Sequence, residues 1–206
     1  SSIRKYLESR GLSAVSKALR FHPSMSYLSK DKKVRLNFPA ILAMVHAPDG
    51  TPVTMHRTYL DPKTSLKAPV ENPKKIMSFV STLSIKGAAI RLFPLVDGEL
   101  AIAEGIETAI AVFEATGTPC WSTITSTIME SFVPPDGVRR LLIFADKDRS
   151  GVGFEAAKKL KARIDALGTI ECVIMLPPSP IPSDKKGVDW LDEFVNHGKE
   201  IFHEIA

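Results

Sequence analysis

The chain has 206 residues, enough for one large domain or two small ones with a hydrophobic core. Its composition, 44% hydrophobic and 24% charged with a formal net charge of +4, is that of an ordinary globular protein. No stretch approaches the roughly 18 apolar residues of a membrane span, and the opening residues SSIRKYLESRGL lack the apolar core of a signal peptide. The two cysteines, Cys120 and Cys172, lie in apolar stretches, as expected of buried, reduced thiols. We therefore expect no membrane partner and a cytoplasmic location.

The charge is unevenly distributed between the two halves of the chain. Residues 1–100 carry 16 Lys and Arg against 7 Asp and Glu, whereas residues 101–206 carry 11 against 16. Such an imbalance indicates that the first half meets a polyanion and that the second half binds cations. The alternative is a surface of solvated lysines with no specific partner.

The first part, residues 1–97, is predicted to form a small basic α+β subdomain. Apolar residues at near-helical spacing favour a helix close to the N-terminus, and Asp49-Gly50 is a strong turn signal between two β-rich runs. The predicted elements are a helix or two short helices at residues 2–20, a β-hairpin at 39–60, an extended basic loop at 61–78 and a further strand at 88–96.

The second part, residues 98–206, alternates between strands and helices. This alternation predicts an α/β fold with a doubly wound, mostly parallel sheet. The run RLLIFA is apolar throughout, as expected of a central strand that is buried on both faces. The predicted strands are residues 100–103, 119–122, 140–145 and 171–176, and the predicted helices are residues 106–116, 126–132, 153–167 and a last one from about residue 189.

Acidic residues follow three of the predicted strands. Glu104 comes directly after the first strand, Asp146 and Asp148 after the third, and Asp189 after the loop that leaves the fourth. In an open α/β sheet, ligands bind beyond the carboxyl ends of the strands, so these carboxylates are expected to converge. Converging carboxylates repel one another unless a cation neutralises them, and oxygen ligands suit Mg²⁺. The sequence therefore predicts a site for Mg²⁺, with Mn²⁺ as the alternative ion.

These acidic segments resemble a known domain. LAIAEGIETAIAV, LLIFADKDRSGVG and KGVDWLDEF are similar to the TOPRIM domain of bacterial-type primases, topoisomerases and some nucleases, and most similar to primase or primase-helicase proteins of phages and plasmids. The resemblance is specific over residues 98–195, and YLESRGL, MHRTYLDPKTSLKAP and KGAAIRLFP extend it weakly into the first half. It implies that Asp146 and Asp148 bind metal and that Glu104 is a metal ligand or the general base.

The chain departs from the primase pattern at one position. Primases commonly have a second acid four residues after the first glutamate, where this chain has Thr108. Glu107 lies one residue earlier and either supports the site indirectly or lies on the surface. The set of metal ligands beyond Glu104, Asp146 and Asp148 therefore stays open, with Asp189 as the expected fourth member.

Several basic residues are candidates for binding phosphates of a nucleotide or nucleic acid. An arginine within apolar sequence either forms a structural pair or holds a phosphate, and a lysine between two acids can simply neutralise them. A further basic run at residues 30–35 either follows a template backbone or is an exposed charged loop. The candidates are Arg57, Lys67, Arg91, Lys147, Lys185 and Lys186.

The favoured hypothesis is a DNA primase catalytic core, a nucleotidyltransferase that uses Mg²⁺ to make short RNA primers on single-stranded DNA for a phage or other mobile element. Its expected partners are a single-stranded DNA template, nucleoside triphosphates and a helicase domain or protein. No G-x-x-x-x-G-K-[ST] motif occurs, so no ATPase is predicted in this chain. The alternatives are a metal-dependent TOPRIM nuclease and a non-catalytic nucleic-acid-binding module of the replication machinery.

Overall fold

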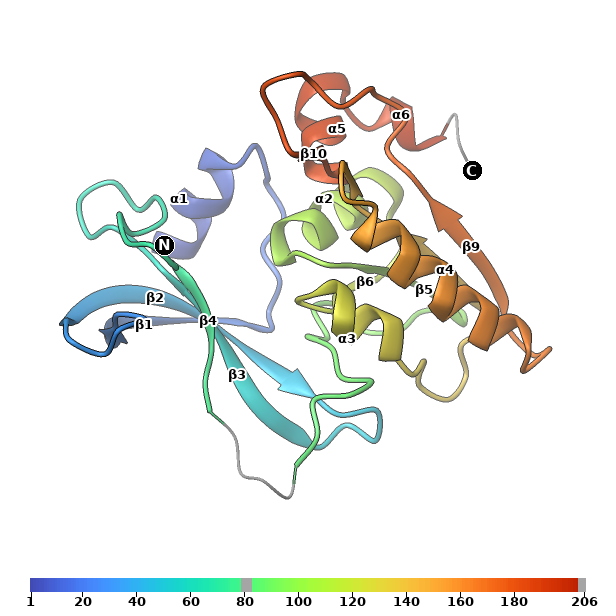
Figure 1. Cartoon of the computed structure of the whole chain (residues 1–206), viewed down its shortest axis with the longest axis horizontal. Coiled ribbons are helices and arrows are strands. Elements are labelled where there is room, and N and C mark those ends of the chain that lie inside the picture. The colour runs from blue at the N-terminus through green and yellow to red at the C-terminus, as the bar shows by residue number, and fades with distance from the viewer. Residues whose placement is uncertain (79–82, 204–206) are drawn as a thin grey trace.

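Two four-stranded sheets organise the computed structural model, which describes residues 1–78 and 83–203 (Figure 1). The first half contains one short helix, α1 (Ser2–Ser9), and an antiparallel sheet with strand order β1-β2-β3-β4. Its strands are β1 (Leu19–Leu28), β2 (Arg35–His46), β3 (Pro52–Tyr59) and β4 (Lys74–Ile76). The predicted hairpin is present as β2 and β3, which pair antiparallel from Ala40 opposite Tyr59 onward.

The structure corrects three predictions in this half, the first being the loop at residues 61–78, in which Lys74–Ile76 form β4 and pair with β3. The N-terminal helix ends at Ser9 instead of extending towards residue 20, because Gly11 adopts a φ of 76° that an α-helix cannot continue through. The predicted strand at residues 88–96 is instead an extended segment that makes single bridges, from Ala89 to His46 and from Ile90 to Ser122. These bridges join the two sheets, and the side chains of Ala88, Ile90 and Leu92 are buried in the core, which explains the apolar character of the segment.

Strand β1 was not predicted, because its sequence lacks the alternation of a half-buried strand. Only Leu19 and Tyr27 of its ten residues are fully buried, and the pairing with β2 shifts register between His22 and Met25. An irregular, largely exposed strand gives no period-two signal in the sequence.

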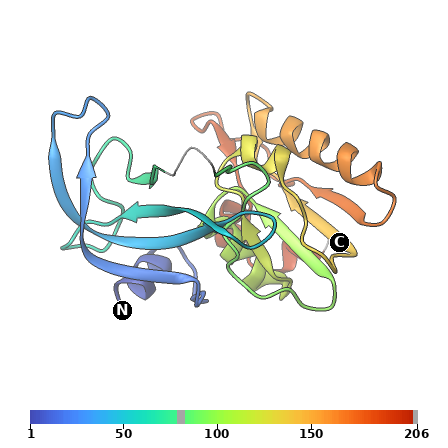
Figure 2. The same cartoon turned by 90° about the horizontal axis from the view of Figure 1, so that it is seen from below.

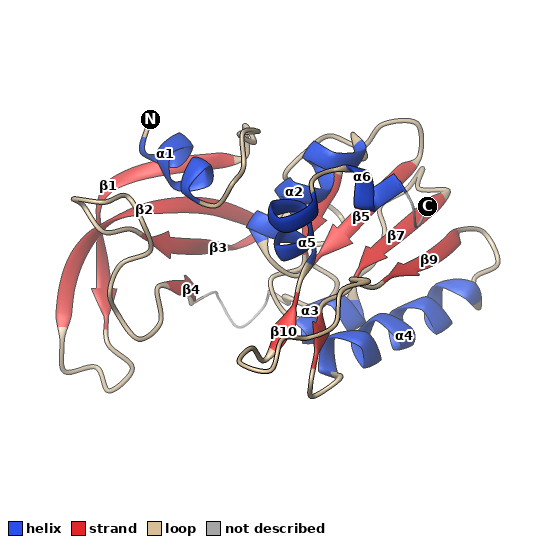
Figure 3. Ribbon diagram, turned by 90° about the horizontal axis from the view of Figure 1, so that it is seen from above, coloured by secondary structure: helices blue, strands red, loops and turns tan. Residues whose placement is uncertain are grey.

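The second half has the predicted α/β architecture. Its parallel sheet has the order β6-β5-β7-β9, and helices cover both faces (Figure 3). A short antiparallel pair, β8 with β10, lies beyond the sheet. The elements are β5 (Glu99–Ala103), α2 (Ile106–Thr116), β6 (Cys120–Ser122), α3 (Ser126–Ser131), β7 (Arg140–Phe144), β8 (Lys147–Asp148), α4 (Val152–Asp165), β9 (Glu171–Met175), β10 (Gly187–Val188), α5 (Trp190–His197) and α6 (Glu200–His203).

The central strands separate two hydrophobic cores. In β7, Leu142 and Phe144 face the core beneath α2 and α5, whereas Leu141 and Ile143 face the core beneath α3 and α4. This strand is buried on both faces, as the run RLLIFA predicts. None of the helices in the described part of the chain has the length and apolar character needed to cross a membrane.

Helix α1 extends the core beneath α2 into the first half. Its buried residues Ile3, Tyr6 and Leu7 belong to the same hydrophobic cluster as Ile110 and Trp190 of the second half. Figure 2 shows the two sheets side by side with α1 at the base of the first. The halves therefore share a core, and the division at residues 97 and 98 remains a prediction from the sequence.

Helix α5 is anchored by the aromatic core, which generates a first prediction. Trp190 is fully buried, lies 5.2 Å from Phe144 ring to ring, and donates its indole N–H to the Met175 carbonyl at 3.1 Å. We expect Trp190→Ala to lower the free energy of unfolding by about 4 kcal/mol, because it leaves a large cavity and an unpaired carbonyl. Urea denaturation measures this loss. The matched change of the exposed Leu167 to Ala should cost less than about 0.5 kcal/mol, and equal losses would contradict the prediction.

Candidate active site

Five acidic residues surround one cavity at the carboxyl end of the parallel sheet. Glu104 follows β5, Asp146 follows β7 and Asp148 lies in β8, while Asp189 and Asp192 stand at the start of α5. The cavity has a volume of about 370 Å³. Its walls are Glu104, Ser126, Asp146, Lys147, Asp148, Val152, Gly153, Lys186, Gly187, Val188, Asp189 and Asp192. The structure thus brings together the four acids that the sequence singles out.

Two glycines allow the backbone to close around this cavity. Gly187 of β10 pairs with Asp148, and a Cβ atom there would lie 2.8 Å from the Lys147 carbonyl oxygen. At the start of α4, a Cβ atom on Gly153 would lie 3.0 Å from the Asp146 carbonyl oxygen. A larger residue at Gly187 would push β10 away from β8, and one at Gly153 would push the start of α4 away from Asp146.

Strain is concentrated beside Glu104. Ile124 has a φ of 70°, a conformation that β-branched residues rarely adopt. Its amide donates to the Glu104 carbonyl at 2.8 Å, and the Ser122 hydroxyl donates to the same carbonyl at 2.6 Å. These two bonds hold the backbone of Glu104 at the end of its strand, and Thr125 then caps α3.

Asp146 carries the largest electrostatic cost of the site. Burial raises its pKa from 3.8 to about 8, and the neighbouring carboxylates of Asp189, Glu104 and Asp148 add to the increase. Its Oδ1 atom is buried and has no hydrogen-bond partner among the described residues. A buried carboxyl oxygen without a donor is unfavourable unless a cation or a proton compensates it.

The other acids differ in how their charge is stabilised. Burial raises the pKa of Glu104 and of Asp189. For Asp148, the effect of burial is outweighed by hydrogen bonds from Ser150 and from the Gly153 amide, which keep its pKa below the usual value. Asp148 is therefore ionised at neutral pH, whereas Asp146 needs a compensating charge.

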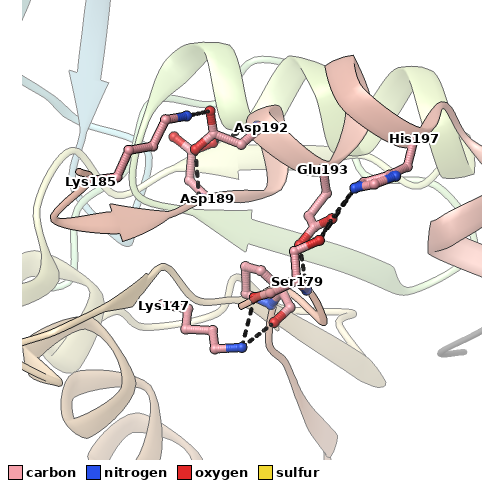
Figure 4. A network of polar contacts seen from close by, with 8 residues as sticks. Lys147, Ser179, Lys185, Asp189, Asp192, Glu193 and His197 are labelled. Atoms are coloured by element: carbon pink, nitrogen blue, oxygen red, sulfur yellow. Dashed lines mark hydrogen bonds and ion pairs between the residues drawn. The ribbon is translucent and has the colours of Figure 1, made fainter. Parts of the chain in front are cut away.

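Asp192 belongs to the site but was missed in the sequence. Asp189 caps α5 by accepting from the Asp192 amide at 2.8 Å, and Asp192 accepts from the Asp189 amide at 3.2 Å (Figure 4). This reciprocal pair is a capping box, whose spacing of three residues is readable in DWLD. Lys185, a predicted phosphate-binding residue, lies 3.3 Å from Asp192 as an ion pair, while Lys186 lines the cavity.

Lys147 lines the acidic cavity and also holds a loop. Its ammonium donates to the carbonyls of Ser179, at 2.8 Å, and Pro177, at 3.2 Å (Figure 4). The amide and hydroxyl of Ser179 in turn donate to the buried carboxylate of Glu193 on α5, each at 2.9 Å. These contacts fix the loop after β9 to both β8 and α5, and so fix Asp189 relative to Asp146.

A second cavity, of about 250 Å³, adjoins the first and brings in the basic half. Glu104, Asp146 and Asp189 line both cavities. Opposite them stand three cations of the first half, Arg10 at the end of α1, Lys67 and Lys74. Two of these, Arg10 and Lys74, were not singled out in the sequence, because only the packing of the two halves brings them to the acids. Its other walls are Gly105, Glu107, Thr108, Ile124 and Leu191.

A third, strongly basic cavity lies on the antiparallel sheet of the first half. It has a volume of about 430 Å³, and Arg57 lies in it beside Tyr59, with its guanidinium carbon 5.6 Å from the ring centre. The Nε atom of Arg57 is buried without a hydrogen-bond partner in the described residues. The structure thus joins Arg57 to the basic run of residues 30–35. The cavity is lined by Ser26, Leu28, Ser29, Lys30, Lys32, Arg35, Arg57, Tyr59 and Lys75.

Arg91 lies apart from these three cavities. Its guanidinium donates to the carbonyls of Ala47, at 3.0 Å, and Pro48, at 2.8 Å, and stacks 4.9 Å from the ring centre of Trp121. These contacts hold the turn between β2 and β3 against the second half. The structural pair, one of the two interpretations of an arginine in apolar sequence, is the arrangement seen here.

The acidic cavity fits a hard divalent cation of the kind that TOPRIM and primase folds generally use. No three His, Cys, Asp or Glu side chains among residues 1–78 and 83–203 lie close enough together to form a ready-made metal group. Mg²⁺ does not require one, since it usually keeps several waters and is held by one or two carboxylates together with substrate phosphates. The unpartnered Oδ1 of Asp146 and the mutual repulsion of the acids are what such a cation would relieve.

Comparison with known families gives two matches along the chain. Residues 99–200 match the Toprim domain family, and residues 1–91 match a domain family of unknown function (DUF7146). A comparison with curated proteins gave no significant match. The second half is thus an α/β domain with acids at the carboxyl end of its parallel sheet, and its sequence is that of a Toprim domain.

Solved structures extend this similarity over the whole chain. A DNA primase domain from Pseudomonas aeruginosa aligns with a TM-score of 0.62 at 14% identity, covering 99% of this chain and 70% of that one. The RNA polymerase domain of the primase DnaG from Mycobacterium tuberculosis aligns with a TM-score of 0.57 at 14% identity, covering 99% and 74%. A DnaG primase catalytic domain bound to single-stranded DNA aligns with a TM-score of 0.58 at 15% identity, covering 99% and 72%. The chain is a TOPRIM-domain protein with the fold of a primase catalytic core.

The raised pKa of Asp146 leads to a prediction of pH-dependent stability. Between about pH 4 and pH 8, the folded state keeps a proton on Asp146 that the unfolded state has released, so stability falls as pH rises across this window. Asp146→Asn has no proton to lose. In the presence of a chelator, we expect its gain in unfolding free energy over wild type to be near zero at pH 4 and about 2 kcal/mol at pH 8.

Denaturant titrations at several pH values measure this difference. The exposed Asp136, changed to Asn, is the matched control and should give no gain that depends on pH. Adding Mg²⁺ should raise the melting temperature of wild type but not that of Asp146→Asn. A gain that is the same at pH 4 and pH 8 would contradict the assignment of the titrating group.

Proposed function

We propose that this protein is the catalytic core of a DNA primase, which uses Mg²⁺ to synthesise short RNA primers on single-stranded DNA during replication of a phage or other mobile element. The observation that carries the proposal is the shared wall of the two cavities, where Glu104, Asp146 and Asp189 face both the acidic cavity and the cations of the first half. A polymerase needs this combination, because it must hold metal ions and the phosphates of a nucleoside triphosphate at the same place.

The proposal gives each part of the site a role. Asp146 and Asp148, or Asp146 with Glu104 or Asp189, would hold the metal as a pair of carboxylates, with water and substrate phosphates as its other ligands. When bound, the metal lowers the pKa of an attacking hydroxyl and stabilises the leaving pyrophosphate. Lys67 and Lys74 bind the triphosphate of the incoming nucleotide as compact positive charges, and Arg10 binds it through the planar fork of its guanidinium. Glu104 serves as a ligand or as the base that takes the proton of the attacking hydroxyl.

The basic cavity of the first half is assigned to the template. Its five cations follow one side of the antiparallel sheet, and the ring of Tyr59 lies beside Arg57. Positive charge along a groove binds the backbone of a single strand without regard to sequence. A nuclease or a non-catalytic module would share this cavity, so the reaction itself has to be tested.

The test is primer synthesis. The 206-residue chain is incubated with single-stranded DNA, labelled ribonucleotides and Mg²⁺ or Mn²⁺, and new RNA is resolved by electrophoresis. We expect short products that disappear with a chelator and fall about 100-fold or more in Asp146→Asn and in Asp148→Asn, because both variants lose charge at the metal. Asp136→Asn should keep wild-type synthesis.

Each alternative gives a different result. Metal-dependent shortening of the DNA without new RNA would contradict the primase proposal and indicate a nuclease. DNA binding with neither product, unchanged in Asp146→Asn, would indicate a non-catalytic module.

Template binding provides a separate prediction. Arg57→Gln removes one cation from the basic cavity, so its affinity for single-stranded DNA should fall several-fold for every sequence, and the slope of log affinity against log salt should become shallower by about 0.7. Fluorescence anisotropy at several NaCl concentrations measures both quantities. Lys63→Gln, a change of an exposed lysine in the same half, is the control, and an equal effect of the two changes would rule out the cavity as the contact.

A further inference from the structure

Glu107 is a buried carboxylate that the acidic cavity does not use. It lies in the first turn of α2, and its side chain is only 6% exposed. Both of its carboxylate oxygens have a partner. Oε1 accepts from the hydroxyl of the buried Tyr6, and Oε2 lies 2.7 Å from the ammonium of Lys74. The interpretation of Glu107 as a surface residue is therefore wrong, and its contacts support the alternative of an indirect role.

The two partners of Glu107 come from different elements of the first half. Tyr6 lies on α1 and Lys74 begins β4, so a single carboxylate ties both elements to the Toprim domain. Among the ion pairs of the described residues, only this one joins the first half to the second. Arg10 lies four residues after Tyr6, which places it on the same face of α1 as the tyrosine. Glu107 thus pairs directly with Lys74, one of the three cations in the second cavity, and contacts Tyr6, which lies one helical turn before a second, Arg10.

The negative charge of Glu107 also offsets the repulsion among the three cations of the second cavity, Arg10, Lys67 and Lys74. Burial alone raises the pKa of Glu107, but the charge and hydrogen bond of Lys74 and the hydrogen bond from Tyr6 outweigh it and hold the pKa at about 2. Partial burial lowers the pKa of Lys67. The positive charges of Lys74 and Arg10 lower this pKa further, whereas the negative charge of Glu107 raises it. The buried His56 adds no competing cation, because burial and Lys74 lower its pKa to about 4.

We propose that Glu107 is a positioning residue, which through Lys74 and through Tyr6 on α1 holds a triphosphate-binding set of cations, Lys74 and Arg10, against the acids of the Toprim domain. The inference rests on the proposed function and deepens it by naming the buried carboxylate that positions the triphosphate-binding cations. It also gives a reason for the departure from the primase pattern. Thr108 stands where primases commonly have a second acid, whereas here the acid is one residue earlier and faces the first half.

The test is triphosphate binding, which does not depend on turnover. Affinity of the 206-residue chain for ATP with Mg²⁺ is measured by calorimetry for wild type, Glu107→Gln, Lys74→Met and the double variant. We expect each single change to weaken binding about tenfold, equivalent to about 1.4 kcal/mol, and the double variant to be no weaker than the weaker single variant. The effects are expected to be non-additive because both changes break the same ion pair between Glu107 and Lys74.

Glu114→Gln is the matched control. Glu114 also lies on α2 and also joins it to the first half, by accepting from the Ser13 hydroxyl at 2.9 Å, but it does not line the second cavity. Its loss should leave ATP affinity unchanged, even if the melting temperature falls. Equal ATP affinity in Glu107→Gln and Glu114→Gln would overturn the inference, as would losses that multiply in the double variant. If Glu107→Gln does not fold, Tyr6→Phe with Lys74→Met replaces it, with the same expectation of non-additivity.

The outcomes separate the inference from the proposed function. Primer synthesis by wild type with normal ATP affinity in Glu107→Gln and Lys74→Met would overturn the inference alone. ATP binding that depends on Glu107, without primer synthesis, would overturn the primase proposal and leave the inference standing. No binding of ATP by wild type would overturn both.

Discussion

Burial of several carboxylates close together is the constraint on which the site depends. The carboxyl end of the parallel sheet gathers Glu104, Asp146 and Asp189 into a region where Oδ1 of Asp146 has no hydrogen-bond partner among the described residues. The fold tolerates this arrangement because hydrophobic packing on both faces of β7 holds the strand ends in place. The same acids require an unfavourable backbone conformation at Ile124 and close backbone packing at the two glycines beside Asp146 and Asp148.

The basic first half places positive charges beside these acids, in the second cavity. In the described part of the chain, none of its cations forms an ion pair with Glu104, Asp146 or Asp189, and Lys74 pairs with Glu107 instead. The acids and cations instead face each other across open space, which is favourable for a ligand that carries both phosphates and a metal. This separation distinguishes a binding site from a structural salt bridge, in which the charges would meet directly.

The second half was largely readable from the sequence. The predicted bounds of α2 agree with the structure, in which Gly117 ends the helix with a φ of 75°, and the apolar run of β7 marked the central strand. The acids could be placed together because parallel strands end at one edge. The same reasoning failed for β1, whose exposed residues carry no pattern, and for residues 88–96, which pack into the core but form only isolated bridges. Arg10, Lys74 and the buried state of Glu107 arise from packing between distant segments, which no local pattern in the sequence reports.

Asp189 has two structural roles, so a mutation at this position changes two things at once. The same carboxylate lines both cavities and closes the first turn of α5, the helix whose Trp190 fills the aromatic core. Removing the side chain would therefore loosen a helix as well as take a charge from the cavities, and a loss of function could come from either change. Asparagine caps a helix about as well as aspartate while carrying no charge. At this position, Asn and Ala together distinguish a residue that binds a ligand from a residue that only holds the helix on which the ligand site is built.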